Sequence, residues 1–271
     1  MDLQHSLDTY IHVPMIKKTK LEEPKKFSVS KDLFSKVVFT CKNQFTISKS
    51  SILDINYGSN ACTTISTYLL YQLMIGTKLS DINWIALMMK GIELWKLWYE
   101  ETKKKNEKER KQTFLDVSPG ILIEFLTQNG CNPGLICLES EADIPTLIDE
   151  KLKMDSSRSN DNNNKENSYI FKSLKSIFID CLSERMSGGV LIIGNYGMTI
   201  FNNGNGFMYF NSHGHKFMNE NSDKAFYACF ENLDELCDFI YNFHNTEIVS
   251  KFHSSANHAT FTRIRLKKIL K

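Results

Sequence analysis

Two separate stretches of the chain contain a cysteine and a histidine, the residue types that nucleophilic hydrolysis by a thiol needs. Cys62 stands in "YGSNACTTISTYLLYQL", where a loop of small and polar residues meets an apolar helical pattern. A thiol is a strong nucleophile at neutral pH only as its thiolate, and the backbone N–H groups at a helix N-terminus favour that charged form. The pattern therefore predicts a nucleophile at the start of a helix, with the backbone N–H of Cys62 helping to bind an oxyanion.

His213 is the candidate general base. It follows the apolar strand pattern "GFMYF", at a point where a side chain at the end of a sheet would face a cleft. Asn211 precedes it by two residues, so both side chains lie on one face if the strand continues. An amide oxygen there would accept the imidazole N–H and fix its tautomer. Cys62, His213 and Asn211 are thus predicted as nucleophile, base and orienting residue.

Other interpretations of these residues stay open. A cysteine on an apolar helix face is most often a core residue, and the histidine could be structural. The sequence "HGH", with His213 and His215, would also supply half of a metal site, completed by His253, His258 or a cysteine. No second HxH pair and no CxxC pair has ligand spacing, so we predict no metal and no other cofactor.

Composition limits the classes of partner. The chain has 271 residues, of which 42% are hydrophobic and 24% charged, as is ordinary for a globular protein. The formal net charge of +2 creates no field that would attract nucleic acid or a membrane surface. No run of about 18 apolar residues occurs, so no membrane-spanning helix is predicted. The composition therefore indicates neither a nucleic-acid-binding protein nor a membrane protein.

Cysteine usage indicates the compartment. The seven cysteines are an odd number, are scattered along the chain, and include no CxxC pair. This distribution favours reduced thiols over a disulfide framework. The opening segment "MDLQHSLDTYIHVPMIKKTK" also lacks the apolar region of a signal peptide. We therefore expect an intracellular, cytoplasmic location.

The first half of the chain is predicted to be mainly helical after an initial strand region. Residues 34–48 have the β-branched and aromatic composition of one strand or two short ones. Apolar residues at helical spacing then predict a helix from Cys62 to Gly76. Further helices are expected to begin at Ser80, as an N-cap, and at Ser118-Pro119.

The second half changes to sheet. Asn-Gly signals at 195–197 and 203–206 predict hairpins between apolar strands. Helical spacing returns at 231–244, and the partly alternating tail from residue 259 predicts a last strand. Strands, a helical block and then an antiparallel sheet with a late helix define an α+β protein.

Two segments are predicted to lie outside the packed domain. Residues 1–30 are polar and basic and are interpreted as a flexible arm. Residues 154–168, "MDSSRSNDNNNKENS", are of low complexity and cannot bury apolar surface, so we predict a disordered insertion there. The remainder, 31–271, is expected to form a single domain.

Taken together, the two chemical stretches resemble the papain-like cysteine proteases of the herpesvirus tegument deubiquitinase type. The resemblance lies in "SNACTTIS" around Cys62 and "YFNSHGHK" around Asn211 and His213. The segment "GGVLIIGNYGMTIFNNGNGFMYF" is similar to the hairpin that leads to the histidine motif, and "FENLDELCDFIYNF" to the helix that follows it. The similarity extends over residues 45–245, and its specific part is the two short motifs around Cys62 and His213.

The resemblance implies a papain-like fold, in which a helical block with the cysteine packs on an antiparallel sheet with the histidine. It also implies a thiol hydrolase that cleaves peptide or isopeptide bonds, with ubiquitin or a ubiquitin-like protein as partner. Its upstream oxyanion-hole glutamine corresponds to Gln44 by position, with Asn43 and Asn56 as the next candidates.

One departure from the family pattern opens an alternative function. The family motif has Asp where this chain has Asn211, although papain-type enzymes use Asn in the orienting role. The alternative is a catalytically dead pseudo-protease that acts as a protein-binding module. A structural protein without a catalytic site is a third hypothesis.

Overall fold

The computed structural model describes eight segments of the chain. These are residues 35–50, 60–109, 117–128, 138–147, 172–194, 196–214, 223–243 and 258–267. The predicted arm at 1–30 and the predicted insertion at 154–168 both lie outside the described residues, as does Asn56. Those predictions therefore stay predictions.

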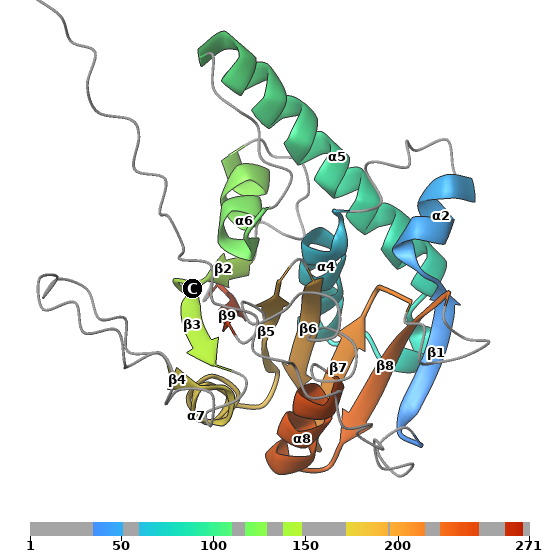
Figure 1. Ribbon diagram of the computed structural model, residues 1–271, viewed down its shortest axis with the longest axis vertical. Coiled ribbons are helices and arrows are strands. Elements are labelled where there is room, and N and C mark those ends of the chain that lie inside the picture. The colour runs from blue at the N-terminus through green and yellow to red at the C-terminus, as the bar shows by residue number, and fades with distance from the viewer. Residues whose placement is uncertain are drawn as a thin grey trace, which may run out of the picture.

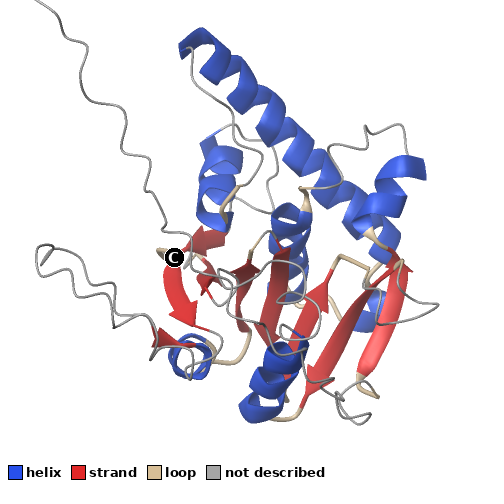
Figure 2. Ribbon diagram, viewed as in Figure 1, coloured by secondary structure: helices blue, strands red, loops and turns tan. Residues whose placement is uncertain are grey.

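The described strands form one mixed sheet, almost entirely antiparallel (Figure 2). Its order is β1-β8-β7-β6-β5-β9-β3-β4, with β2 paired to β9, and only β3 and β4 run parallel. The strands are β1 (Val37–Lys42), β2 (Leu138–Ser140), β3 (Ile144–Leu147), β4 (Lys172–Ser173), β5 (Ser187–Ile193), β6 (Tyr196–Asn202), β7 (Phe207–Asn211), β8 (Lys224–Phe230) and β9 (His258–Leu266).

The centre of the sheet consists of the predicted hairpins. Ser187 of β5 pairs with Asn202 of β6, and the register continues to the pair Ile193 and Tyr196. The β6–β7 turn follows, with Gly204 at φ 91°, a left-handed conformation that glycine adopts at little cost. The Asn202 side chain accepts the Gly204 N–H at 2.7 Å, which closes the turn locally. The hairpin prediction is confirmed.

Helices cover both faces of the sheet (Figure 1). On one face lie α4 (Cys62–Met74), α5 (Trp84–Glu109) and α6 (Pro119–Gln128), with α2 (Gln44–Ser50) and the 3-10 turn η1 (Leu79–Asp81) beside them. The other face is covered by α7 (Leu174–Cys181) and α8 (Leu233–Phe243). In Figure 1, α8 lies in front of the sheet and α4 behind it.

Alternation along the strands creates two separate cores. Met208 and Phe210 of β7 belong to the core under α4 and α5, whereas Tyr209 belongs to the core under α8. Successive strand side chains point to opposite faces, so a strand covered on both sides is apolar throughout. This explains why β5, β6 and β7 are almost wholly buried and why their sequences read as continuous apolar runs.

Two predicted element boundaries are wrong. Residues 34–48 do not form strands throughout, because β1 ends at Lys42 and α2 begins at Gln44. The Asn43 side chain accepts the Thr46 N–H at 2.9 Å, and this cap starts a helix in a segment of high strand propensity. Ser80 lies in the 3-10 turn, and Asn83 caps α5 instead by accepting the Ala86 N–H at 3.1 Å.

The other helix boundaries agree with the expectations. Gly76 ends α4 at φ 93°, and Ser118 caps α6 by accepting the Ile121 N–H at 3.3 Å. The last predicted strand is β9, in the middle of the sheet. No helix in the described part of the chain is long and apolar enough to cross a membrane. The predicted α+β class is confirmed.

Candidate active site

Cys62 is the first residue of α4, as the pattern predicts. The N-cap residue is Ala61, whose side chain cannot cap, and no acidic residue lies in the first turn. The side chain of Cys62 is 5% exposed. Its Sγ accepts a hydrogen bond from the backbone N–H of Gly197 at 3.3 Å. The backbone N–H of Gly197 and the start of α4 therefore both place positive partial charge next to the sulfur.

Gly197 allows β6 to approach the start of α4 this closely. A Cβ at this position would lie 3.1 Å from the Thr63 nitrogen and 3.2 Å from the Thr63 Cα. The Gly197 carbonyl accepts the Ser66 hydroxyl at 3.2 Å, so both polar groups of this residue bind α4. The Asn-Gly signal at 195–197 predicts a turn here, whereas Gly197 lies inside β6, and a glycine inside an apolar strand is a signal of close backbone approach.

His213 lies two residues beyond the end of β7 and is held by Asn211. The Asn211 Oδ1 accepts the backbone N–H of His213 at 2.8 Å and lies 2.9 Å from the ring Nδ1. A backbone N–H can only donate, so the atom of Asn211 that faces it is the carbonyl oxygen. The ring Nδ1 must then carry a proton, so in the neutral imidazole Nε2 presents the lone pair. The neutral amide of Asn211 therefore fixes the tautomer that a general base requires.

Tyr209 holds the other end of the Asn211 amide. The Asn211 Nδ2 donates to the Tyr209 hydroxyl at 3.1 Å, and both side chains are fully buried. Burial raises the pKa of Tyr209 well above its usual value, so the phenol stays neutral and accepts this bond. Sequence reasoning missed Tyr209, although its position on the same strand face as Asn211 was available from the period of two.

Gln44, the first residue of α2, lies beside the imidazole. Its Nε2 is 3.5 Å from the His213 Nε2, and its side chain is fully buried. Of the two other candidates for the oxyanion hole, Asn43 uses its side-chain oxygen to cap α2, and Asn56 lies outside the described residues. Gln44 is thus the candidate that the structure brings next to His213.

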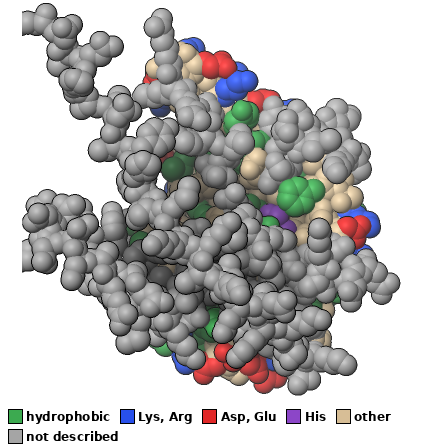
Figure 3. Space-filling model, in the orientation of Figure 1, with side chains coloured by type: hydrophobic (Ala, Val, Ile, Leu, Met, Phe, Trp, Pro, Cys, Tyr) green, Lys and Arg blue, Asp and Glu red, His purple; other side chains and the backbone are tan. Residues whose placement is uncertain are grey.

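Two aromatic rings flank the imidazole. The Tyr196 ring meets it edge to face, with 4.6 Å between ring centroids, and the Phe45 ring lies at 5.6 Å. His213 is 2% exposed. Figure 3 shows histidine atoms at the surface of this face, next to a hydrophobic side chain. The rings restrict the movement of the imidazole.

The contacts link the four predicted residues at one end of the central strands. The sulfur of Cys62 meets the backbone of Gly197, and the ring of the preceding residue, Tyr196, meets His213. Across the β6–β7 pair, Met198 lies opposite Asn211. Gln44 approaches His213 from α2. The structure thus places a sulfur, an imidazole, an orienting amide and a donor amide against the start of β6.

A metal site at the "HGH" sequence receives no support from the described residues. Within those segments, no three His, Cys, Asp or Glu side chains are grouped so that they could hold an ion. The Nδ1 of His213 is already used by Asn211. His215 and His253 lie outside the description, and so does the side chain of His258.

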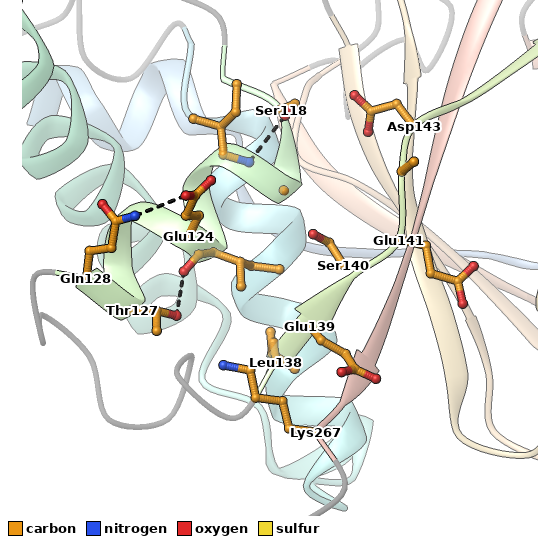
Figure 4. Close-up of a pocket in the computed structure, with 14 residues that line it drawn as sticks. Ser118, Glu124, Thr127, Gln128, Leu138, Glu139, Ser140, Glu141, Asp143 and Lys267 are labelled. Carbon is orange, nitrogen blue, oxygen red and sulfur yellow. Dashed lines mark hydrogen bonds between the residues drawn. The ribbon is translucent and has the colours of Figure 1, made fainter.

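A cavity of about 630 Å³ lies apart from these residues, between α6 and β2 (Figure 4). Most of its charged side chains are acidic, but several serve the fold. Glu141 forms ion pairs with Arg263 and Arg265 of β9. Glu124 accepts a hydrogen bond from Gln128 at 3.0 Å on the same helix. None of Cys62, His213, Asn211 and Gln44 lines this cavity.

Comparison with known proteins supports the fold. No family model matches the sequence, and no curated protein sequence matches it. Among solved structures, the chain is similar to the ubiquitin-specific protease encoded by tegument protein M48 of murine cytomegalovirus, crystallised with a ubiquitin-based suicide substrate. The TM-score is 0.54 at 9% identity, over 87% of this chain and 88% of that one. The Pseudomonas avirulence protein AvrPphB matches at a TM-score of 0.44 and 9% identity, over 81% of this chain and 100% of that one.

The fold is therefore the predicted one. A helical block that carries Cys62 packs on an antiparallel sheet that carries His213, in the arrangement of papain-like cysteine proteases.

Proposed function

We propose that this protein is a thiol hydrolase that cleaves peptide or isopeptide bonds at Cys62. The observation that carries the proposal is the hydrogen-bond chain from Tyr209 through Asn211 to His213. It leaves a protonated Nδ1 and a basic Nε2 on the imidazole that lies beside Gln44. Such a chain is the arrangement by which a nucleophile's base is oriented by a third group.

In the proposed reaction each of these residues has its own role. His213 Nε2 takes the proton of the Cys62 thiol, and the thiolate attacks the substrate carbonyl carbon. The carbonyl electron pair moves to oxygen, where the N–H of Cys62 and the Nε2–H of Gln44 stabilise the negative charge. The imidazolium then protonates the leaving amine as the C–N bond breaks. His213 then acts as base and takes a proton from water, the water oxygen attacks the thioester carbonyl, and the Cys62 thiolate leaves.

We propose ubiquitin or a ubiquitin-like protein as the substrate class. The M48 protease, which was crystallised with a ubiquitin-based substrate, has the same fold, and this likeness motivates the choice.

No disulfide links the cysteines that the structure describes, Cys62 among them. A reduced nucleophile suits a reducing compartment, and we expect the enzyme to act there.

A ubiquitin-based thiol-reactive probe tests the proposal. The wild-type chain is expected to form a covalent adduct, seen as a mass increase on a denaturing gel, and Cys62→Ala is expected to form none. Cys229→Ala is the matched control, because Cys229 is an exposed cysteine on β8 that pairs with Met208 of β7. It should label at the wild-type rate.

The two alternatives give other results in the same experiment. If wild type and Cys62→Ala behave alike, the hydrolase proposal is wrong. Binding of ubiquitin that survives Cys62→Ala, with no hydrolysis at any pH, would identify the pseudo-protease. If the chain neither binds ubiquitin nor is labelled by the probe, the remaining hypothesis is a structural protein without a catalytic site.

The Asn211 position gives a second prediction. Asn211→Ala removes the acceptor of the His213 Nδ1–H, and we expect turnover to fall by about 10²-fold, the lower end of the range for general acid–base catalysis. Asn211→Asp keeps an acceptor oxygen toward His213, and the Tyr209 hydroxyl can donate to the other oxygen instead of accepting. Turnover of Asn211→Asp should therefore exceed that of Asn211→Ala by at least about tenfold.

Steady-state kinetics with a ubiquitin-derived fluorogenic amide measure this difference. Asn242→Ala, in the last turn of α8, is the matched control, since its side-chain amide donates to the Asp238 carbonyl of the same helix at 2.7 Å. Equal turnover of the aspartate and alanine variants would contradict the assigned role of Asn211.

A further inference from the structure

Ser212, between the proposed orienting and basic residues, makes two contacts with one partner. Its backbone carbonyl accepts the Gln44 backbone N–H at 3.1 Å. Its hydroxyl donates to the Gln44 Oε1 at 2.8 Å. Both side chains are fully buried, so water does not replace either contact. A pair of bonds to the backbone and side chain of one residue defines its position and its orientation.

The hydroxyl contact decides which end of the Gln44 amide faces the site. With Oε1 held by Ser212, the amide nitrogen points to His213, 3.5 Å from its Nε2. With the neutral imidazole, whose proton is on Nδ1 facing Asn211, the reverse orientation would place a carbonyl oxygen against the lone pair of the other ring nitrogen. Two lone pairs in contact without water are unfavourable. Ser212 and Asn211 therefore favour the same orientation from opposite sides.

We infer that Ser212 is a positioning residue that aims the Gln44 N–H at the oxyanion of the proposed reaction. The inference rests on the proposed function. It extends the site to three consecutive residues with distinct tasks: Asn211 orients the base, Ser212 orients the oxyanion donor, and His213 transfers the proton. The donor is then prearranged before substrate arrives, as electrostatic stabilisation of a transition state requires.

The test removes only the hydroxyl. Ser212→Ala keeps the backbone bond to Gln44, so α2 stays attached. We expect kcat for a ubiquitin-derived fluorogenic amide to fall by at least about tenfold, toward the 10²- to 10³-fold loss typical of a deleted oxyanion donor. KM should change little. Alkylation of Cys62 by iodoacetamide forms no oxyanion, and its rate should stay within about twofold of wild type.

A double-mutant cycle separates positioning from a merely structural role. Gln44→Ala removes the donor itself, so adding Ser212→Ala to it should cost no further turnover. Gln44→Glu keeps an acceptor for the Ser212 hydroxyl and loses the donor. It should therefore lose as much turnover as Gln44→Ala, and it provides a test even if Ser212→Ala fails to fold.

Several results would overturn the inference. These are wild-type turnover in Ser212→Ala or in Gln44→Glu, equal losses in hydrolysis and alkylation, or additive losses in the double mutant. With an active wild type, the outcomes for Ser212→Ala and for the double mutant contradict the role of Ser212 alone. Wild-type turnover in Gln44→Glu contradicts the oxyanion role of Gln44 as well. A wild type without turnover and without probe labelling contradicts the proposed function, and the role of Ser212 falls with it.

Discussion

Replacement of His213 by alanine is expected to lower turnover of a ubiquitin-derived amide by about 10³- to 10⁴-fold, the upper part of the range for general acid–base catalysis. Two steps lose their proton carrier: formation of the thiolate and protonation of the leaving amine. The hydrogen-bond chain from Tyr209 through Asn211 would then have no imidazole at its end. The loss should appear mainly in kcat, because the ring orients and transfers protons and does not provide the main substrate contacts.

Single-turnover kinetics and iodoacetamide alkylation measure the two effects of His213 separately. Alkylation of Cys62 at neutral pH should slow in His213→Ala, because fewer molecules carry the thiolate without the imidazolium partner. The Gly197 N–H and the helix N-terminus stay in place, so alkylation should not stop.

His215→Ala is the matched control for His213→Ala. It removes the second histidine of the "HGH" sequence, and under the hydrolase proposal it should retain nearly full turnover. Equal losses in the two variants, together with inhibition by a metal chelator, would favour the metal alternative and contradict the assigned role of His213.

Replacement of Gly91 by alanine is expected to lower the free energy of unfolding by about 3 kcal/mol, the upper end of typical overpacking costs. Gly91 is where α5 crosses α4. A Cβ there would lie 2.4 Å from the Ile65 Cγ1 and 2.7 Å from the Ile65 Cα, and the latter is a backbone atom that cannot turn away. The Thr64 hydroxyl also lies 2.8 Å from the Gly91 carbonyl, so separating the helices strains a buried hydrogen bond.

The sign of the Gly91 effect is the informative part. Glycine to alanine inside an exposed helix normally stabilises by up to about 1 kcal/mol, so helix propensity predicts the opposite result. Gly120→Ala in α6 is the matched control, because its nearest neighbour would be the Ser140 hydroxyl at 3.1 Å, the end of a side chain that can rotate. Its effect should stay below about 1 kcal/mol.

Denaturant unfolding measures the stability of both glycine variants. Probe labelling of Gly91→Ala should also slow, because Ile65 lies one turn from Cys62 on α4. A Gly91→Ala variant as stable as wild type would show that α4 and α5 are not in close contact at this crossing.

The sequence by itself predicted several of the elements and the two halves of the candidate site. Helical periodicity from Cys62, the hairpin signals and the spacing of Asn211 and His213 are all local features, and each appears in the structure. Local patterns suffice there because the period of a helix or a strand sets which residues share a face.

Only the tertiary structure decided how the two halves meet. The Gly197 N–H reaches the Cys62 sulfur across 135 residues of sequence, and Gln44 reaches His213 across 169. Local propensity also misjudged Gln44 itself, because the segment around it is rich in strand-forming residues while the Asn43 cap and the bond to Ser212 make it the start of a helix. Contacts of this kind depend on close approach and on the satisfaction of buried polar groups, which are properties of the packed chain and leave no period in the sequence.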